Sequence, residues 1–221
     1  MQREIQLTAD GSHTISIPEI KVTYHSCHGA IGESLHVYIQ GGLLSIISQR
    51  MHQPIRILEI GFGTGLNALL SLQQAILQKQ PIHYTAIEPF PLSEEEVSLI
   101  NHGHLLSMQA AFLVLHNAHW EKDIWINEWF TLKKMKVPLL QLTNVDGIQV
   151  IYFDAFAPTV QPELWTQAIF EKMYDCLAPG GLLLTYCSKS DVRRAMTAAG
   201  FRIEKNPGPW GKREMVSAWK K

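Results

Sequence analysis

Residues 55–67 read IRILEIGFGTGLN, and the architecture of the chain can be worked out from them. The first six residues are mostly β-branched or apolar, as in a buried strand, and glycines end them. From Leu66 to Leu77, leucines then recur at helical spacing. Glycines between a strand and a helix allow a sharp turn and let a ligand approach the free amides where the helix begins. The stretch therefore predicts a strand, a ligand-binding loop and a helix.

Alternating strands and helices follow this unit along the chain. We expect strands at 83–87, 130–135, 149–153 and 182–187, a final antiparallel pair at 201–205 and 215–219, and helices at 93–100, 162–177 and 191–200. Ser93 and Glu96 form a capping-box pair at the start of the first of these helices. The alternation predicts an α/β fold with a mostly parallel, twisted sheet between two layers of helices.

Residues 1–50 differ from the rest of the chain. They contain two short strand-like segments and one helical segment, at 15–17, 21–24 and 43–47. No linker, repeat or low-complexity tract interrupts the 221 residues. We therefore expect one domain over 1–221, with a β-rich extension over 1–50 and an α/β core over 51–221. Within the core, 103–129 is an insertion whose pattern indicates no particular structure.

The composition is that of a globular protein, with 46% hydrophobic and 18% charged residues. It excludes disordered, collagen-like and coiled-coil chains. No apolar stretch approaches the ~18–20 residues of a membrane span, and the N-terminus lacks the order of a signal peptide. The three cysteines form no CxxC pair, and the ten histidines, three close pairs included, have no zinc-site spacing. We expect a cytoplasmic protein with no membrane partner and no bound metal.

The glycine loop is followed by a strand that ends at Glu88, whose carboxylate could accept hydrogen bonds from both hydroxyls of a ribose. A dinucleotide fingerprint would need a third glycine where the chain has Leu66. Glu59, just before the glycines, suits a cofactor with a positively charged amino-acid portion, and ExGxGxG resembles the first motif of S-adenosylmethionine-dependent methyltransferases. The predicted cofactor-binding residues are Glu59, Gly61, Phe62, Gly63, Gly65, Asn67 and Glu88. A nicotinamide site and a glycine-rich turn that binds nothing are the alternatives.

Asp154 follows the predicted central strand, so the carboxyl-end rule for open α/β sheets places it in the same crevice as the glycine loop. It begins one of several distinctive blocks: ESLHVY (33–38) with GG (41–42), GFGTGLN (61–67), EPFPL (88–92), DAFAP (154–158), ELW (163–165) and GKREM (211–215). On these blocks the chain resembles the methyltransferase domain of the MnmC family. The resemblance implies a Rossmann-like class I methyltransferase fold and methyl transfer from S-adenosylmethionine to 5-aminomethyl-2-thiouridine at the tRNA wobble position.

Two departures from that family qualify the expectation. Its bifunctional members carry a flavin-dependent oxidoreductase domain after the methyltransferase, and this chain stops at Lys221. We therefore expect methyl transfer alone, without oxidoreductase activity, and separate enzymes that make the aminomethyl precursor. Many methyltransferases also carry an acid after the third strand that contacts adenine, and residues 136–139 contain none. Backbone amides would then recognise the adenine.

Methyl transfer to an amine requires a free lone pair on nitrogen, so a positioned proton acceptor favours the reaction. Asp154 is the predicted catalytic group, and its alternative role is a cap of the loop after the strand. Phe156 and Pro158 would shape a dry pocket around it. Trp165 would either stack on the uracil ring or belong to the core.

The C-terminal residues 189–221 contain nine Lys and Arg and three acids, whereas the formal net charge of the whole chain is −1. The predicted contacts to the phosphates of the tRNA anticodon loop are Arg193, Arg194, Lys212 and Arg213. A solvated basic face is the alternative reading of this segment. Two other functions stay open at this level: a small-molecule N- or O-methyltransferase with the same cofactor site, and a nucleotide-binding protein without catalysis.

Overall fold

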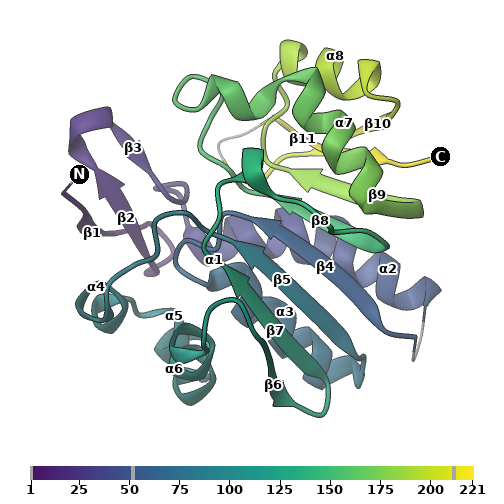
Figure 1. Ribbon diagram of the computed structural model, residues 1–221. Helices are drawn as coiled ribbons and strands as arrows, with labels where there is room; N and C mark the ends of the chain where they lie inside the picture. The colour runs from purple at the N-terminus through teal and green to yellow at the C-terminus, as the bar shows by residue number, and fades with distance from the viewer. Residues whose placement is uncertain (1, 51–52, 211–212) are drawn as a thin grey trace.

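A computed structural model describes residues 2–50, 53–210 and 213–221 (Figure 1). The strands of its large sheet are β4 (Ile55–Ile60), β5 (Ile82–Ile87), β6 (Asp123–Asn127), β7 (Phe130–Met135), β8 (Ile148–Phe153), β9 (Leu177–Thr185), β10 (Arg202–Pro207) and β11 (Glu214–Trp219). They lie in the order β10-β11-β9-β8-β4-β5-β7-β6. The five strands from β9 to β7 pair in parallel, and β11, β10 and β6 add antiparallel edges. The predicted α/β fold and its antiparallel C-terminal pair are confirmed.

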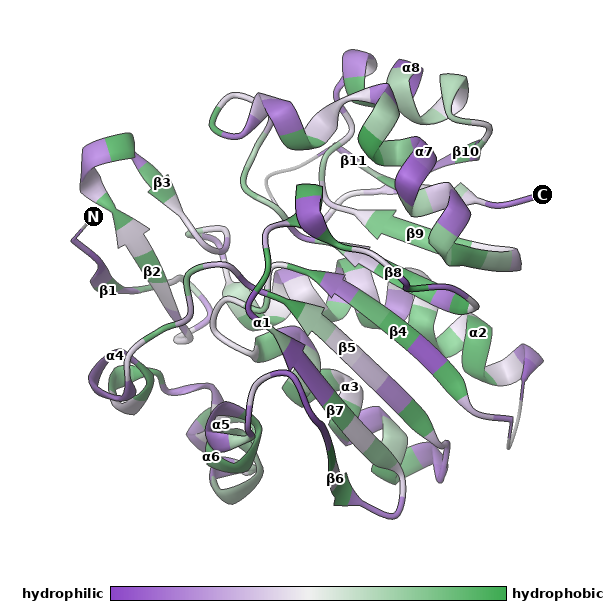
Figure 2. Cartoon of the chain, in the orientation of Figure 1, coloured by the Kyte–Doolittle hydropathy of each residue, from purple (hydrophilic) through white to green (hydrophobic). Residues whose placement is uncertain are grey.

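Helices cover both faces of this sheet, as predicted (Figure 1). One face carries α1 (Ala30–Ser34), η2 (Leu35–Leu43), α2 (Leu44–Gln49) and α3 (Leu66–Gln78), and the other carries α7 (Gln167–Cys176) and α8 (Ser190–Ala198). A hydrophobic core lies on each face of the sheet, and alternate residues of the central strands point into one core or the other. In β8, Val150 and Tyr152 belong to the first core, whereas Ile151 and Phe153 belong to the second. Strands buried on both faces explain the mainly hydrophobic colouring of the sheet centre (Figure 2).

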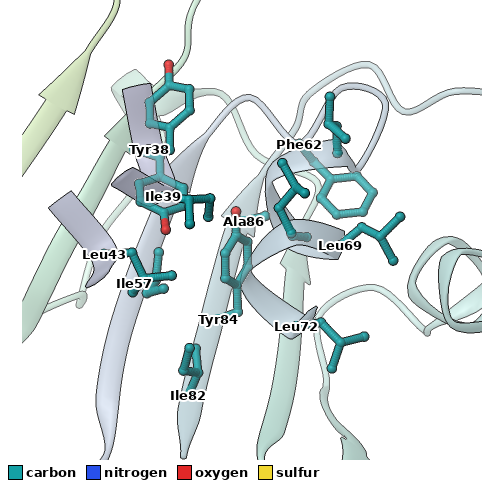
Figure 3. Close-up of a cluster of buried hydrophobic side chains, with 14 of the residues drawn as sticks. Tyr38, Ile39, Leu43, Ile57, Phe62, Leu69, Leu72, Ile82, Tyr84 and Ala86 are labelled. Atoms are coloured by element: carbon teal, nitrogen blue, oxygen red, sulfur yellow. The ribbon is translucent and has the colours of Figure 1, made fainter. Parts of the chain in front are cut away.

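The first core is shown in Figure 3, where side chains of η2, β4, β5 and α3 meet beneath the glycine loop. The helical layer approaches the sheet closely at η2, a π-helix that continues α1 without a break. A β-carbon at Gly42 would come within 2.4 Å of a methyl group of Leu184 in β9. A larger residue at position 42 would have to push the buried side chains of Leu182 and Leu184 aside, which favours glycine there.

The extension over residues 1–50 contains strands only in its first half. These are β1 (Glu4–Leu7), β2 (His13–Ile17) and β3 (Val22–Thr23), with the short turn η1 (Pro18–Ile20), and they form a separate antiparallel sheet. The second half, from residue 30 onward, is the helical layer on the large sheet. The single-domain organisation with its boundary at residue 50 stays a prediction.

Two elements differ from the sequence-based expectations. The helix predicted over 162–177 is divided into a 3₁₀ turn, η4 (Pro162–Trp165), and α7, because Thr166 has an extended backbone with ψ 160°. Thr166 then caps α7 by accepting a hydrogen bond from the amide of Ile169. Strand β9 begins five residues earlier than the predicted 182, and its pairing with β8 is irregular between Ile148 and Val150.

The segment between β5 and β8 holds the remaining elements. These are α4 (Glu94–Leu99), α5 (His102–Leu105), α6 (Gln109–Asn117) and η3 (Leu139–Gln141), together with β6 and β7. The capping box at Ser93 and Glu96 is present as predicted. In the insertion, α5 and α6 lie beside the glycine loop and β6 closes the edge of the sheet (Figure 1). No helix in the described parts of the chain is long and apolar enough to cross a membrane.

Candidate functional site

The glycine loop between β4 and α3 is fixed to the end of β5. The amides of Gly61 and Phe62 both donate to the carbonyl of Ile87, at 3.0 and 3.2 Å. Gly61 has φ +93°, and a β-carbon there would lie 3.2 Å from the carbonyl oxygen of Asp154. The end of β4 can therefore run directly against the end of β8. This close approach brings Asp154 and the loop to the same edge of the sheet.

Glu88 ties the loop to the turn after β5. One carboxylate oxygen accepts a hydrogen bond from the amide of Gly63 at 3.0 Å, and the other accepts from the amide of Phe90 at 2.9 Å. A carboxylate oxygen has more than one lone pair, so each can also accept a hydroxyl from the cleft. Glu88 is thus held in place for the predicted ribose contact and organises the loop as well.

Asp154 is joined to the loop by a side-chain hydrogen bond. The amide nitrogen of Asn67, near the start of α3, donates to Asp154 Oδ2 at 2.9 Å and to Glu59 Oε1 at 3.0 Å. Glu59 is almost completely buried beneath the loop and does not line the cleft, whereas Asn67 and Asp154 do. The structure therefore brings the three residues together with Asn67 in the centre.

Both carboxyl groups have raised pKa values. Burial is the main cause of the raised pKa of Asp154, and Glu33 adds a like charge, whereas His25, Tyr38 and Asn67 act in the opposite direction. Burial likewise raises the pKa of Glu59 well above its ordinary value. A carboxylate whose pKa is raised accepts a proton more readily, which suits a general base.

A cavity of about 900 Å³ opens at this edge of the sheet. Its walls come from the glycine loop, the turn after β5, the segment after β7, the residues after β8 and the N-terminal sheet; they include Tyr24, His25, Phe62, Glu88, Phe90, Pro138, Leu139, Leu140, Asp154 and Phe156. This volume is at the upper end of the range for small-molecule sites, so it can hold a nucleoside cofactor together with part of a second substrate.

The cavity fits a nucleoside cofactor with an amino-acid portion. Glu88 offers oxygens for the ribose, and Pro138 and Leu139 give an apolar wall for a base. The Oδ1 atom of Asn67 is buried and has no hydrogen-bond partner within the described structure. A buried orphan acceptor is costly, and the ammonium group of a cofactor is the kind of donor that would satisfy it.

The segment after Asp154 is held rigidly. The Phe156 amide donates a hydrogen bond to Gln161 Oε1 at 3.0 Å, and the Phe156 carbonyl accepts one from the indole of Trp165 at 2.8 Å. The Phe156 ring lies edge-on to that of Tyr24, with centroids 5.2 Å apart. Trp165 is buried and packs against Phe153, so it supports Phe156 from the core. Stacking of Trp165 on a substrate base finds no support in this placement.

Pro158 is half-buried and lies outside the cavity wall, as does Gly65, where α3 begins. Phe156 faces the cavity. The predicted dry pocket is therefore built by Phe156 together with Tyr24, which the sequence did not indicate. Tyr24 follows β3, and burial raises its pKa to about 12, so its hydroxyl stays protonated. The N-terminal sheet thus forms one wall of the site.

Three histidines hold the glycine loop from behind, although their positions in the sequence suggested only core or surface residues. The ring nitrogens of His25 and His102 lie 2.9 and 3.2 Å from the hydroxyl of Thr64. His116 Nε2 lies 3.0 Å from the Thr64 carbonyl oxygen. Their common partner is a threonine between two glycines, and no spacing pattern could have revealed it. No group of His, Cys, Asp or Glu in the described ranges could hold a metal ion.

Lys134 completes this support at the hydrophilic end of β7 (Figure 2). It is 1% exposed, and its ammonium donates to the carbonyl of His116. The ammonium also lies 5.3 Å from the ring centre of Phe62 and 4.7 Å from that of Trp120. Burial lowers the pKa of Lys134 to about 8. The lysine therefore positions Phe62, a residue of the loop, through cation–π contact.

We expect the stability of the protein to fall below pH 6.5 because His116 is buried in its neutral form. Burial lowers the pKa of His116 to about 4, so between pH 6.5 and 4 the unfolded chain binds a proton that the folded chain does not. His116 then reduces the free energy of unfolding by up to about 1.4 kcal/mol per pH unit as the pH falls. Urea unfolding at pH 7, 6 and 5 measures this slope.

His116→Gln should flatten that slope, and His119→Gln, an exposed neighbour, serves as the control. Equal slopes for the wild type and His116→Gln would contradict the assignment.

The four basic residues predicted to contact RNA do not line the cavity as far as they are described. Arg194 is exposed and pairs with Asp191, and Arg193 is half-buried on the same helix, α8. Arg213 is exposed next to β11, and Lys212 lies outside the described residues. Lys220 instead caps α7, donating to the carbonyls of Tyr174 and Leu177.

Comparison with known proteins identifies the family of the chain. The chain is 30% identical over 205 residues to the tRNA 5-methylaminomethyl-2-thiouridine biosynthesis bifunctional protein MnmC of Leptospira interrogans. This match covers 87% of the chain and 32% of that relative. The chain spans about a third of the length of this curated relative. The crystal structure of MNMC2 from Aquifex aeolicus matches with a TM-score of 0.77 and 26% identity, over 100% of this chain and 71% of that one.

A human methyltransferase-like protein 13, solved in complex with SAH, shares the fold at a TM-score of 0.51 and 15% identity, over 86% of this chain and 82% of that one. The family described as S-adenosyl-L-methionine-dependent methyltransferase matches residues 105–221. These findings confirm the predicted resemblance to the methyltransferase part of MnmC proteins and the predicted cofactor. The chain belongs to the S-adenosyl-L-methionine-dependent methyltransferase family.

Proposed function

We propose that the protein methylates the 5-aminomethyl group of wobble 5-aminomethyl-(2-thio)uridine in tRNA, giving 5-methylaminomethyl-(2-thio)uridine. The observation that carries this proposal is the carboxylate of Asp154, held by Asn67 at the wall of the cleft that Glu88 and the glycine loop share. The similarity to MnmC of Leptospira interrogans over 87% of the chain supports the choice of substrate.

Different residues of the cleft would bind different parts of the cofactor. Glu88 would bind the ribose of S-adenosylmethionine, and the loop amides with Asn67 would hold its amino-acid portion. Gly65 would open the helix, and Pro138 with Leu139 would cover the adenine. S-adenosylmethionine supplies an activated methyl group on a positively charged sulfur.

Asp154 would orient the amine and take its proton. The bond between the methyl carbon and sulfur breaks as the bond to nitrogen forms, and the nitrogen loses one proton, directly or through water, to the carboxylate. The lone pair must be free for this displacement, so an amine close to a proton acceptor reacts and an ammonium does not. Phe156 and Tyr24 would exclude water around the amine.

The substrate would reach this cleft as a single-stranded base. The wobble base lies in the anticodon loop, so little unstacking is needed to insert it. Arg193, Arg194, Lys212 and Arg213 would contact the phosphates around it. The protein would act in the cytoplasm, on tRNA whose aminomethyl group separate enzymes have made.

The direct test is methylation of tRNA by the purified protein. Bulk tRNA from a strain that lacks this gene is incubated with S-adenosylmethionine, and its nucleosides are then analysed by mass spectrometry. The proposal expects 5-aminomethyl-(2-thio)uridine to disappear as its N-methyl derivative forms. If the nucleosides stay unchanged while a small amine is methylated, the protein is a small-molecule methyltransferase and the proposal is wrong.

The salt dependence of tRNA binding tests the basic residues. We expect Arg193→Ala/Arg213→Ala to reduce the slope of log K against log salt by roughly 0.7 for each lost phosphate contact. Binding of S-adenosylmethionine should stay unchanged, because neither side chain lines the cavity. Arg56→Ala is the matched control, since Arg56 is a partly exposed cation at the opposite end of β4. An unchanged slope in the double variant would assign these arginines to a solvated face.

A further inference from the structure

We propose that Asn67 is the positioning residue of Asp154, and that Glu59 serves the reaction by fixing the Asn67 amide and not by touching the cofactor. This inference rests on the proposed function, because it concerns the same proton acceptor. It revises the role predicted for Glu59 from its place before the glycine loop.

The geometry at Asn67 favours one orientation of its side chain. The amide nitrogen lies 3.0 Å from Glu59 Oε1 and 2.9 Å from Asp154 Oδ2. An amide nitrogen has two hydrogens, so each carboxyl group receives one. In the reversed orientation the amide oxygen would face two carboxyl oxygens without a donor between them, unless a carboxyl were protonated. Asn67 is 2% exposed, so both contacts are largely shielded from water.

The hydrogen bond from Asn67 fixes the plane of the Asp154 carboxylate. With Oδ2 engaged by Asn67, rotation about the last bond of the Asp154 side chain would break a hydrogen bond. Oδ1 is then the oxygen that meets the amine in the cleft. A proton acceptor held in one orientation keeps the amine in line with the methyl group, and small misplacements are costly in such displacements.

Glu59 is a poor choice for stability alone. It is 1% exposed, and its Oε2 has no partner within ordinary hydrogen-bond distance in the described part of the chain, although the neighbouring hydroxyl of Tyr84 stabilises its charged form. A buried carboxyl group without full partners costs free energy, and an apolar side chain would avoid that cost. A glutamate at position 59 is explained if its carboxyl group is needed to accept the hydrogen bond from the Asn67 amide. Burial also keeps Glu59 away from the cofactor, because it does not line the cavity.

Several other groups face Asp154 and influence its charge. From the N-terminal segment, η2 and the end of β9, the titratable or polar neighbours are His25, Glu33, Tyr38 and Tyr186. The buried hydroxyl of Tyr38, labelled in Figure 3, lowers the pKa of Asp154, although no described residue lies within ordinary hydrogen-bond distance of it. None of these groups connects Asp154 to the glycine loop. Asn67 does connect them. Replacing Asn67 should therefore lower kcat in a way that replacing any of these other groups would not.

The test replaces Asn67 with leucine, which has similar size and no donor. We expect kcat to fall roughly tenfold to a hundredfold because the proton acceptor is no longer oriented. The acidic limb of the kcat/KM profile that belongs to Asp154 should move up by about one pH unit, since the charged form loses a donor. In an Asp154→Asn background at saturating S-adenosylmethionine, the same replacement should cause no further loss of kcat.

Ser71→Ala is the matched control. Ser71 is buried on the same helix one turn later, and its hydroxyl lies 3.2 Å from that of Tyr152 rather than near Asp154. It should leave the rate and the pH profile unchanged. If Asn67→Leu does not fold, Asn67→Ser gives the same test, because serine is too short to reach both carboxyl groups. Glu59→Leu should reproduce part of the loss in kcat, with unchanged affinity for S-adenosylmethionine.

Two outcomes would overturn the proposal. One is an unshifted acidic limb in the Asn67 variants, and the other is a loss of rate in the Asp154→Asn background equal to that in the wild type. Weakened cofactor binding by Glu59→Leu with a normal kcat would return Glu59 to the cofactor site. Failure of the proposed function is a separate result, because the wild-type protein would then leave aminomethyl-uridine tRNA unmethylated.

Discussion

Asp154→Ala should lower the rate of methylation by about 10²-fold or more, the usual scale for a positioned proton acceptor. The carboxylate lies at the cleft wall, burial raises its pKa, and Asn67 orients it. Removing it leaves the amine protonated more often and less well aligned. Affinity for S-adenosylmethionine should stay nearly the same, since Glu88 and the loop amides do not depend on the Asp154 side chain. Single-turnover methylation and calorimetry measure the two quantities.

Asp146→Ala controls for the loss of an acidic side chain near the same strand. Asp146 is 91% exposed, precedes β8 and pairs loosely with Arg56 at the opposite end of the sheet. Its replacement should change neither quantity. A wild-type rate for Asp154→Ala would leave Asp154 as a cap of the loop after β8, and the proposed mechanism would lose its proton acceptor.

The fold could be predicted because its signals are local. Buried strands such as β4 and β8 are short apolar runs, and glycines or a capping box mark the neighbouring helix ends. The carboxyl-end rule then placed Glu88 and Asp154 in one crevice without any knowledge of distances. The chain direction and the strand order carry that information, so the sequence was sufficient for these two residues.

Contacts between distant segments could not be predicted in the same way. Thr64 is held by histidines from three separate elements, and nothing in its spacing from His25, His102 or His116 indicates a contact. Each of the three has another histidine two or three residues away, and that local pairing gives no sign of a partner in a distant segment. Their shared role arises only when the N-terminal sheet and the insertion fold against the loop.

Trp165 is a residue for which the sequence predicted a contact that the structure does not contain. Its place in a distinctive block after Asp154 favoured a role in the site, and the structure places it in the core. The division between η4 and α7 at Thr166 turns the indole toward Phe153 and the carbonyl of Phe156. A sequence block can therefore reflect support for a site residue as well as contact with the substrate.

Glu88→Ala should weaken the binding of S-adenosylmethionine by roughly 30- to 150-fold, equivalent to about 2–3 kcal/mol for lost charged hydrogen bonds. The loss has two sources. The carboxylate no longer accepts the ribose hydroxyls, and the amides of Gly63 and Phe90 lose their acceptor. The loop then has to be ordered by the cofactor itself. Isothermal titration calorimetry gives the affinity, and thermal unfolding of the free protein gives the cost to the loop.

Glu88→Gln separates the two sources. Glutamine keeps one oxygen acceptor, so it can hold either the Gly63 amide or the Phe90 amide while the charge on the ribose contact is lost. We expect an affinity between those of the wild type and Glu88→Ala. Glu95→Ala, an exposed acid on α4, controls for the change in net charge. If Glu88→Ala lowers the melting temperature and leaves the affinity unchanged, Glu88 only ties the glycine loop to β5, and the ribose must be held by another group of the cleft.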